Sequence, residues 1–493
     1  MERLSDDPAT SSGSREMGEA CGVYTSCGRM AEYLRDRSLR HPCDSRSLAS
    51  RLFFTFHPQQ PTMAARNPLD IPEILFLVGK YIPLWHFSPP GILYAFQPRD
   101  MLSCTQVSRL FRITMLPILW YIVDESIMAT LPIDIIRKYT PYIRIHLNYG
   151  LRSDFPTDNR PFCTELIHLS FAEKVKKDHH VELIKSNPGL KSLKGSFSSD
   201  FSDQYGDTFE NLKELEDFQC ILDRGDNTSY QQFFRPIAPT LRTMKLLAKS
   251  TTLDLDGLVF PKLKELTVDL LNEHEARILL QGSPNLESLT SSHFYSNKLI
   301  RVIKTGVCPA LKSLKVGMSD QDQDGVAEML EGRVGFQSLE LSFGTFSGRL
   351  TAAINHHASS LTHLSLYKTK YGVMWGPSTS HLHQILGTCG QLKDVVLGLV
   401  VDVIGVLMTA DHWKNPNALE RLSMGTLGAL ESYIDRKTDE YVNAWRLPTG
   451  IMSRAHDIKF LKAIFEAAEG FSRLRTITMD GIVYEKSRPT TPG

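Results

Sequence analysis

Residues 284–291 read Pro-Asn-Leu-Glu-Ser-Leu-Thr-Ser, and residues 309–316 read Pro-Ala-Leu-Lys-Ser-Leu-Lys-Val. Each stretch places an apolar anchor two residues after a proline and a second apolar residue three positions after the anchor. The anchor pattern recurs thirteen times, most copies standing 22 to 31 residues apart, and in ten copies the fifth position after the anchor is also apolar. The anchors are Tyr142, Leu166, Leu190, Leu212, Leu241, Leu263, Leu286, Leu311, Phe336, Leu361, Leu392, Leu419 and Leu474.

Each copy predicts a short strand, because residues two apart on a strand point to the same face and can be buried together. Helical patterns lie between the anchors, as at Asn272–Gln281, where Asn272 and Glu275 have capping-box spacing, and at Phe460–Glu469. A strand and a returning helix in about 20–29 residues resemble the leucine-rich repeat, whose copies stack because one alone cannot cover its apolar face. We therefore expect an α/β fold, a leucine-rich-repeat solenoid over residues 121–484.

The repeats depart from that family eight residues after the anchor, where the family has Asn or Cys and only Cys220 fits. This departure predicts an irregular horseshoe. The 55-residue interval from Leu419 to Leu474 holds either a degenerate repeat or a long insertion around residues 436–448.

A different pattern occupies residues 67–120. Asp70 and Glu73 have capping-box spacing ahead of an apolar stripe at helical intervals, and Pro83 ends this first expected helix. Asp100 begins a second expected helix, which bears Leu102, Val107, Leu110 and Phe111. Two such helices carry more apolar surface than they can hide from each other, so another surface must cover them.

In order and residue type this segment resembles the F-box: Pro-Glu-Ile-Leu-x-x-Val from Pro72, Asp-Met-Leu-x-Cys-x-x-Val-Ser-Arg from Asp100, and a final Leu-Trp at Trp120. The resemblance implies that the segment docks on the adaptor subunit of a cullin-RING (SCF-type) ubiquitin ligase. An insert at 84–98 departs from the family. Alternatively, residues 67–120 only cap the end of the repeat array. The residues implied in adaptor binding are Leu69, Pro72, Ile74, Leu75, Val78, Leu102, Val107, Phe111 and Trp120.

A target protein is expected on the concave side of the array, where the strand residues that do not face the core are presented. The alternative for each such residue is an ordinary solvated side chain. Two over-long repeats, at Cys220–Tyr230 and Tyr367–Ser380, add candidate loops. The candidate target-binding residues are Lys245, Glu265, Lys315, Glu340, Phe343, His363, Tyr367, Tyr371, Trp375 and Arg421.

The composition argues against several other classes of protein. Fifty-five basic residues balance 55 acidic ones, so no basic field points to nucleic acid. The apolar stretch from Val395 to Met408 is shorter than the roughly 20 residues of a membrane span. The eight cysteines form no C-x-x-C pair, and no signal peptide is evident, so we expect a reducing location, the cytoplasm or the nucleus. Residues 1–62 and 485–493 are expected to be disordered tails, and Met63 is a possible alternative start.

The sequence holds no nucleotide-binding or hydrolase motif, so we expect neither enzyme activity nor a cofactor. The histidine pairs His356-His357 and His381-Leu-His383 lack companion ligands at metal-binding spacing. Taken with the resemblance, the residues predict a substrate-recognition subunit of an SCF-type ubiquitin ligase. The alternative is a ligase-independent scaffold or inhibitor that uses the same concave face, with residues 67–120 sealed against the first repeat.

Overall fold

The computed structural model divides the chain into two units, residues 1–66 and 67–493, and every described residue belongs to the second. The expected tail over residues 1–62 therefore lies outside the described residues, as do residues 486–493. The described residues are 69, 71–82, 85–87, 94–96, 99–124, 132–148, 163–175, 178–197, 206–222, 231–248, 253–269, 271–291, 297–343, 346–368, 379–398, 413–424, 471–479 and 482–485.

A long, open sheet dominates this unit. Its fifteen described strands, β3 to β17, follow one another in chain order; β3 to β16 run parallel, and β17 closes the far edge antiparallel to β16. The strands are β3 (Ile122–Asp124), β4 (Ile145–Asn148), β5 (His168–Val175), β6 (Ser192–Phe197), β7 (Asp217–Leu222), β8 (Thr243–Ala248), β9 (Glu265–Asp269), β10 (Ser288–Ser291), β11 (Ser313–Gly317), β12 (Ser338–Phe343), β13 (His363–Lys368), β14 (Asp394–Gly398), β15 (Arg421–Met424), β16 (Thr476–Met479) and β17 (Ile482–Glu485).

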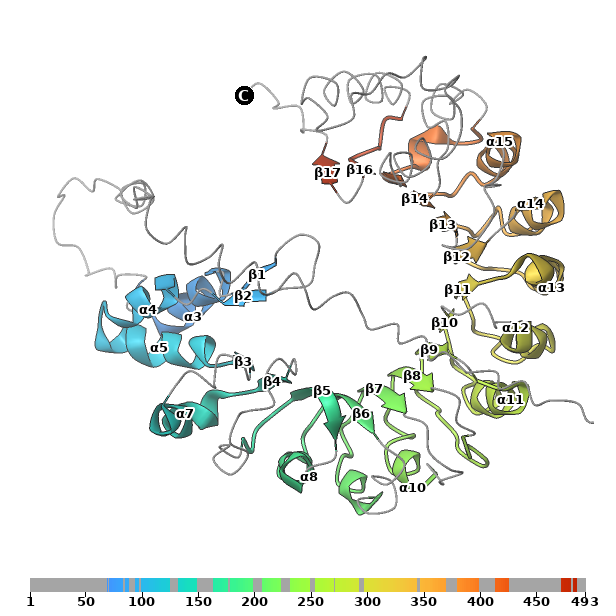
Figure 1. The fold of residues 1–493 in the computed structure, drawn as a ribbon. Helices are drawn as coiled ribbons and strands as arrows, with labels where there is room; N and C mark the ends of the chain where they lie inside the picture. The colour runs from blue at the N-terminus through green and yellow to red at the C-terminus, as the bar shows by residue number, and fades with distance from the viewer. Residues whose placement is uncertain are drawn as a thin grey trace, which may run out of the picture. The chain divides into compact units, whose positions relative to one another are not determined.

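Helices follow most strands and lie on the outer side of the curved sheet, which leaves the strands on the inner, concave side (Figure 1). This is the one-strand-per-repeat arrangement expected of a leucine-rich-repeat solenoid, and the predicted α/β class is confirmed. The repeat helices are α7 (Ile133–Tyr139), α8 (Asp178–Lys185), α10 (Gln231–Phe234), α11 (Glu273–Gln281), α12 (Asn297–Lys304), α13 (Gln323–Glu331), α14 (Gly348–Asn355) and α15 (Thr379–Thr388), with 3₁₀ turns η2 (Thr140–Tyr142), η4 (Gly206–Phe209), η5 (Asp320–Asp322) and η7 (Pro416–Ala418).

A hydrogen-bond ladder fixes the register from repeat to repeat. Thirteen successive carbonyl oxygens, from Tyr121 to Glu420, each accept two backbone N–H groups from the next strand start, at 2.7–3.3 Å. The Tyr121 oxygen, for example, accepts from Arg144 and Ile145, and the Glu420 oxygen accepts from Arg475 and Thr476. The repeating part of the chain therefore begins at Tyr121, directly after the N-terminal helices.

The prolines before the anchors belong to turns. The backbone N–H of Leu286 donates to the Ser283 oxygen at 3.3 Å, and that of Leu311 donates to the Cys308 oxygen at 3.2 Å. Pro284 and Pro309 thus occupy the second position of a four-residue turn, where the fixed φ of proline is favourable. Such turns leave the anchor leucines pointing into the core.

Strand register corrects two of the thirteen predicted anchors. His146 pairs with Leu169, so the anchor three residues before it is Ile143, which is buried, and not the exposed Tyr142. Phe218 pairs with Leu193, which makes Leu215 the anchor of β7 in place of Leu212. With Leu215 as anchor, the polar Asp217 that broke the pattern faces away from the core, and Cys220 is a core residue, buried beside Leu246.

In the described sheet β15 pairs directly with β16, so no further strand stands between these two repeats. Of the two possibilities left open by the sequence, an insertion is the one the sheet supports. The predicted helix at Phe460–Glu469 lies outside the described residues. The capping box of α11 is confirmed: the Asn272 side chain accepts from the Glu275 N–H, and the Glu275 carboxylate accepts from the Asn272 N–H.

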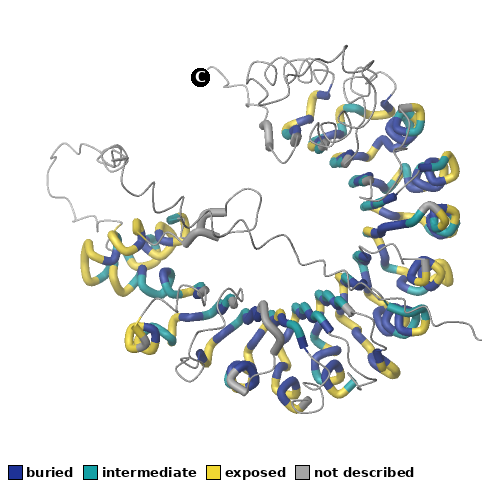
Figure 2. Tube along the Cα trace, in the orientation of Figure 1, coloured by how far each residue is buried: buried dark blue, intermediate teal, exposed yellow. Residues whose placement is uncertain are grey.

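The core is a continuous row of leucines and phenylalanines between the sheet and the helices (Figure 2). Leu289, Leu314, Leu339 and Leu364 stand side by side on adjacent strands, and all are fully or almost fully buried. Burial of such a side chain contributes roughly 1.5–3 kcal/mol, and each repeat adds several. No single repeat has a second apolar layer of its own, so stability depends on stacking.

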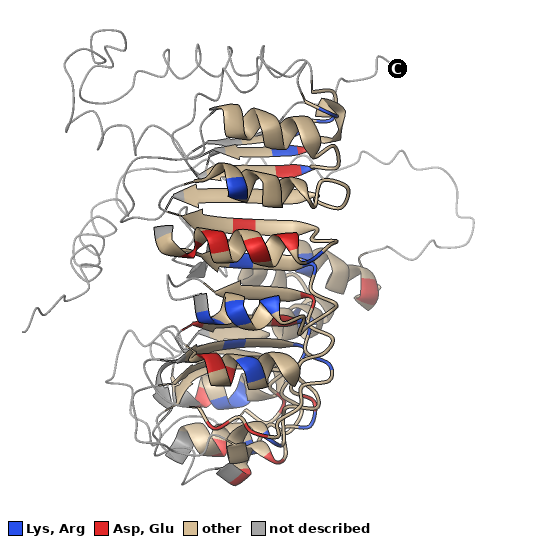
Figure 3. Ribbon diagram, turned by 90° about the vertical axis from the view of Figure 1, so that its right-hand side faces the viewer, with Lys and Arg blue, Asp and Glu red and all other residues tan. Residues whose placement is uncertain are grey.

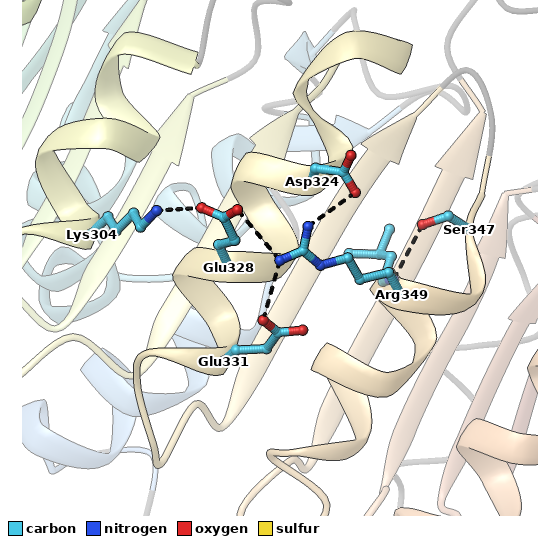
Figure 4. Close-up of polar contacts among 7 residues, drawn as sticks. Lys304, Asp324, Glu328, Glu331, Ser347 and Arg349 are labelled. Carbon is cyan, nitrogen blue, oxygen red and sulfur yellow. Dashed lines mark hydrogen bonds and ion pairs between the residues drawn. The ribbon is translucent and has the colours of Figure 1, made fainter.

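Charges of opposite sign alternate between the three neighbouring helices α12, α13 and α14 on the outer side (Figure 3). The charged residues of α12 are all basic and those of α13 are all acidic. Lys304 of α12 pairs with Glu328 of α13, and Arg349 of α14 reaches Asp324, Glu328 and Glu331 at 3.4–3.6 Å (Figure 4). This network favours the observed order of repeats, although exposed pairs stabilise little.

Candidate functional site

Three short helices precede the sheet: α3 (Pro72–Tyr81), α4 (Arg99–Thr105) and α5 (Arg109–Leu119). The second helix expected from the sequence is therefore two helices. Its break is explained by Ser108, whose hydroxyl accepts from the Phe111 N–H and begins a new helix. The predicted capping box at Asp70 and Glu73 is wrong, because α3 begins at Pro72 with Ile71 as N-cap and no side-chain cap.

The three helices share a small core of their own, made by Leu75, Met101, Met115 and Leu119. Gly79 allows α3 to approach α5 closely. A Cβ atom at this position would stand 2.5 Å from Ile118 Cδ1 and 2.7 Å from Met115 Sδ. A core of four fully buried side chains is small for three helices, which leaves much of their apolar surface outside it.

Most of the exposed large hydrophobic side chains in the described part of the chain lie on or beside these three helices. The described residues include thirteen exposed large hydrophobic side chains. Nine of these lie from Leu69 to Tyr121, although this stretch is a small part of the chain. We call these nine residues the apolar face. Soluble proteins rarely leave such a concentration uncovered, and it is typical of a protein-binding surface. The apolar face consists of Leu69, Phe76, Leu77, Val78, Tyr81, Leu102, Val107, Ile113 and Tyr121.

Four of the nine predicted adaptor-binding residues belong to the apolar face: Leu69, Val78, Leu102 and Val107, the last 66% exposed. Pro72 is exposed as well, and Ile74 is half-buried at its edge. Phe111 is half-buried and packs on the small core.

Leu75 and Trp120 are corrections. Leu75 is completely buried among the three helices, so it holds them together and has no surface to offer a partner. Trp120 is half-buried, and its indole stacks on the Tyr139 ring with centroids 4.7 Å apart. Val123 pairs with His146, which makes Trp120 the anchor of the first repeat, 23 residues before Ile143. Trp120 therefore joins the helices to the solenoid.

The sequence interpretation missed Phe76, Leu77, Tyr81, Ile113 and Tyr121. Leu77 and Tyr81 are four residues apart and lie on the side of α3 away from the Leu75–Gly79 side. That spacing was available in the sequence, but an apolar residue on a helix is ordinarily taken as core. Within the insert, the described residues form two short strands, and β1 (Trp85–Phe87) pairs antiparallel with β2 (Tyr94–Phe96).

The concave face presents most of the predicted target-binding residues. Lys245, Lys315, Glu340, His363, Tyr367 and Arg421 all lie on strands, each next to a core residue, and are at least partly exposed, as is Glu265. Phe343 is a correction: it follows Leu339 and Leu341 at intervals of two, so it faces the core and is completely buried. Tyr371 and Trp375 lie outside the described residues.

Several concave-face side chains pair across neighbouring strands. Lys315 of β11 pairs with Glu340 of β12. Asp394 of β14 accepts from Arg421 at 2.8 Å and lies 3.2 Å from His363 Nδ1. In both groups the carboxylate is the more enclosed partner, and Arg421 and Lys315 are the more exposed. The outward groups of these clusters are therefore cations.

Several titratable side chains of the described residues are buried in the core. Burial raises the pKa of the thiols of Cys163 and Cys389 to about 12, which keeps them protonated and unreactive. His357 is buried against Phe336, and its Nε2 lies 3.0 Å from the Leu330 oxygen. Across the described residues, no group of three or more His, Cys, Asp or Glu side chains is placed to hold a metal ion.

No known family model matches the sequence, and no curated protein matches it. Among solved structures, the chain is similar to a chain of the Rad7 and Elc1 complex in yeast, with a TM-score of 0.40 and 15% identity. The match covers 67% of this chain and 94% of that one. Similarity at this level does not extend to function. Within the described part of the chain, no helix is long and apolar enough to cross a membrane.

Proposed function

We propose that this protein is the substrate-recognition subunit of an SCF-type ubiquitin ligase. In this proposal the apolar face binds the adaptor subunit, and through it a cullin, while the concave face of the repeats binds a target protein. The protein itself is non-catalytic, needs no cofactor and acts in the cytoplasm or the nucleus. The observation that carries the proposal is the apolar face itself, on helices whose sequence resembles the F-box.

The exposure of apolar side chains on the N-terminal helices favours this function over a ligase-independent scaffold. A segment that served only as a cap would turn its apolar residues toward the first repeat. Here that contact is made by Trp120 stacked on Tyr139, whereas Leu77 and Val107 point to solvent and are 55% and 66% exposed. Because Leu77 and Val107 are exposed, replacing them by charged residues leaves the packing of the helices in place. The proposal can therefore be tested without unfolding the helices.

The test is co-purification of the full chain with the adaptor from cells. The wild-type chain should recover the adaptor, and Leu77→Asp with Val107→Asp should abolish recovery, because a carboxylate buried in an apolar interface is strongly unfavourable. Val259→Asp with Val334→Asp is the matched control, since both valines are exposed on the repeats. Failure of the wild type to recover the adaptor, or full recovery by the first variant, would contradict the proposal.

A further inference from the structure

One row of side chains on the concave face carries three lysines and, between β6 and β11, no carboxylate. It crosses strands β6 to β11 at equivalent positions and consists of Lys194, Gln219, Lys245, Thr267, Thr290 and Lys315. We call it the lysine row. The strands that carry it, β6 to β11, lie on the inner side of the curved array, with the helices outside them (Figure 1).

The cations of the lysine row are largely uncompensated. Among the described residues no ion pair is found for Lys194 or Lys245, and only Lys315 has one, with Glu340 of the next strand. The uncharged members Gln219, Thr267 and Thr290 are half-buried polar groups that donate and accept hydrogen bonds. The next position of the row, on β12, is Glu340, which pairs with Lys315, so Lys194 and Lys245 are the two cations of the row for which the described residues supply no carboxylate partner.

The two neighbouring rows on the same strands contain three carboxylates, Asp217 and Glu265 on one side and the buried Asp269 on the other, and an Asp or Glu side chain is shorter than a lysine side chain. Asp217 accepts a hydrogen bond from the Ser192 hydroxyl at 2.7 Å, which holds it near the sheet, and Glu265 is exposed. A lysine stem extends farther from a sheet than either side chain, so the outermost charges are the ammonium groups. Burial lowers the pKa of His168, and Lys194 lowers it further while Asp217 raises it.

From this arrangement we infer that the lysine row binds an extended acidic segment of the target protein. Adjacent strands lie about 4.8 Å apart, so Lys194 and Lys245 are separated by roughly 10 Å and Lys245 and Lys315 by roughly 14 Å. An extended peptide advances about 3.3 Å per residue, so it meets a lysine every three to five residues or so. Carboxylates at that spacing pair with Lys194 and Lys245, and at Lys315 an incoming carboxylate shares the ammonium group with Glu340. Three cations beside carboxylates make too weak a basic field for nucleic acid.

This inference rests on the proposed function in one respect, since it takes the concave face as the target-binding side. Its test uses the full chain and fluorescent synthetic peptides in which Glu recurs every fourth residue among Leu and Ser, with matched Gln and Lys peptides. We expect the Glu peptide to bind, the Gln and Lys peptides not to bind, and binding to weaken with salt, because exposed charges are screened over about 10 Å at 0.1 M.

Substitution locates the binding. Lys194→Gln, Lys245→Gln and Lys315→Gln together should weaken binding of the Glu peptide at least about fivefold at low salt. The control Lys213→Gln, Lys262→Gln and Lys298→Gln removes the same charge from exposed positions off the concave face and should change nothing. Reversal by Lys194→Glu and Lys245→Glu should transfer binding to the Lys peptide.

Three outcomes would overturn the inference: no binding of the Glu peptide to the wild-type chain, equal binding of the Gln peptide, or equal losses in the lysine-row and control variants. Recovery of the adaptor by the same variants separates this result from the proposed function. If the adaptor is recovered but the Glu peptide does not bind, only the inference about the lysine row is contradicted. If the wild-type chain does not recover the adaptor, the proposed function is contradicted.

Discussion

The indole of Trp120 lies nearly parallel to the phenol ring of Tyr139, with ring centroids 4.7 Å apart and an interplanar angle of 20°. Trp120 follows α5 directly, and Tyr139 ends α7 of the first repeat. Trp120 also contacts both the small helical core and the long core of the solenoid. One side chain therefore couples the helices that carry the apolar face to the repeats that carry the concave face.

Replacing Trp120 should loosen this junction. We expect Trp120→Ala to lower the free energy of unfolding by roughly 2–4 kcal/mol, because it removes a large, partly buried aromatic side chain at a repeat anchor. Chemical unfolding followed by circular dichroism measures the change. Tyr139→Phe keeps the stacked ring and should cost much less; a similar loss in both variants would show that the ring contact is not what matters.

The anchors show what the sequence specifies well and what it does not. Leu286, Leu311 and Phe336 were predictable because each apolar position is repeated and each is buried by the same neighbours. Tyr142 and Leu212 were misassigned because each is an apolar residue close to the true anchor, Ile143 or Leu215. Only the pairing of His146 and of Phe218 with the neighbouring strands shows which residue is the anchor.

The candidate site was predictable in location and only partly in detail. A periodic stripe identifies a helix, but it does not tell which apolar residues meet another helix of the same chain. Leu75 and Val78 have the same sequence signal; Leu75 is buried because α5 crosses α3 at Gly79, a contact between segments far apart in sequence. The prediction for Phe343 could have been avoided from the sequence. Phe343 stands two and four residues after the core residues Leu341 and Leu339 on β12, so it points to the same side of the strand as they do.

Two helical glycines should respond oppositely to enlargement. Gly79→Leu should destabilise the helices by about 1–3 kcal/mol, because the space above this residue is filled by Ile118 and Met115. Gly325→Ala in α13 meets no atom within 4 Å and should stabilise by roughly 0.5–1 kcal/mol through its helix propensity. Thermal melts of the two variants check both signs; stabilisation by Gly79→Leu would contradict the close approach of α3 and α5.

Buried His357 should make stability depend on pH. Burial is the main cause that lowers its pKa from 6.5 to about 4 in the folded chain. The unfolded chain then binds a proton that the folded chain does not, so stability is full above pH 6.5 and falls as the pH drops from 6.5 through 4. The expected loss at pH 5 is about 2 kcal/mol.

Urea unfolding at pH 7.5 and pH 5 measures the contribution of His357. His357→Gln should flatten the pH dependence over this interval, although it lowers stability at both values. His356→Gln, at the exposed neighbouring position, should keep the dependence of the wild type. A wild-type slope that survives His357→Gln would assign the titration to another group.

Arg349 should contribute a small stabilisation that salt removes. It faces Asp324, Glu328 and Glu331 of the preceding helix, and these carboxylates raise its pKa although desolvation opposes them. Arg349→Gln should lower the melting temperature slightly at low ionic strength and not at all at about 1 M salt, where the Debye length is roughly 3 Å. A loss that persists in high salt would indicate packing by the arginine stem.

Affinity for the purified adaptor subunit tests the central claim most directly. Calorimetric titration of the full chain with the adaptor should show binding that Val107→Asp weakens at least about tenfold, equivalent to roughly 1.4 kcal/mol. Val334→Asp, at a valine 80% exposed on the repeats, should leave the affinity unchanged. Equal affinity of the wild-type and Val107→Asp chains, or no binding by either, would contradict the account.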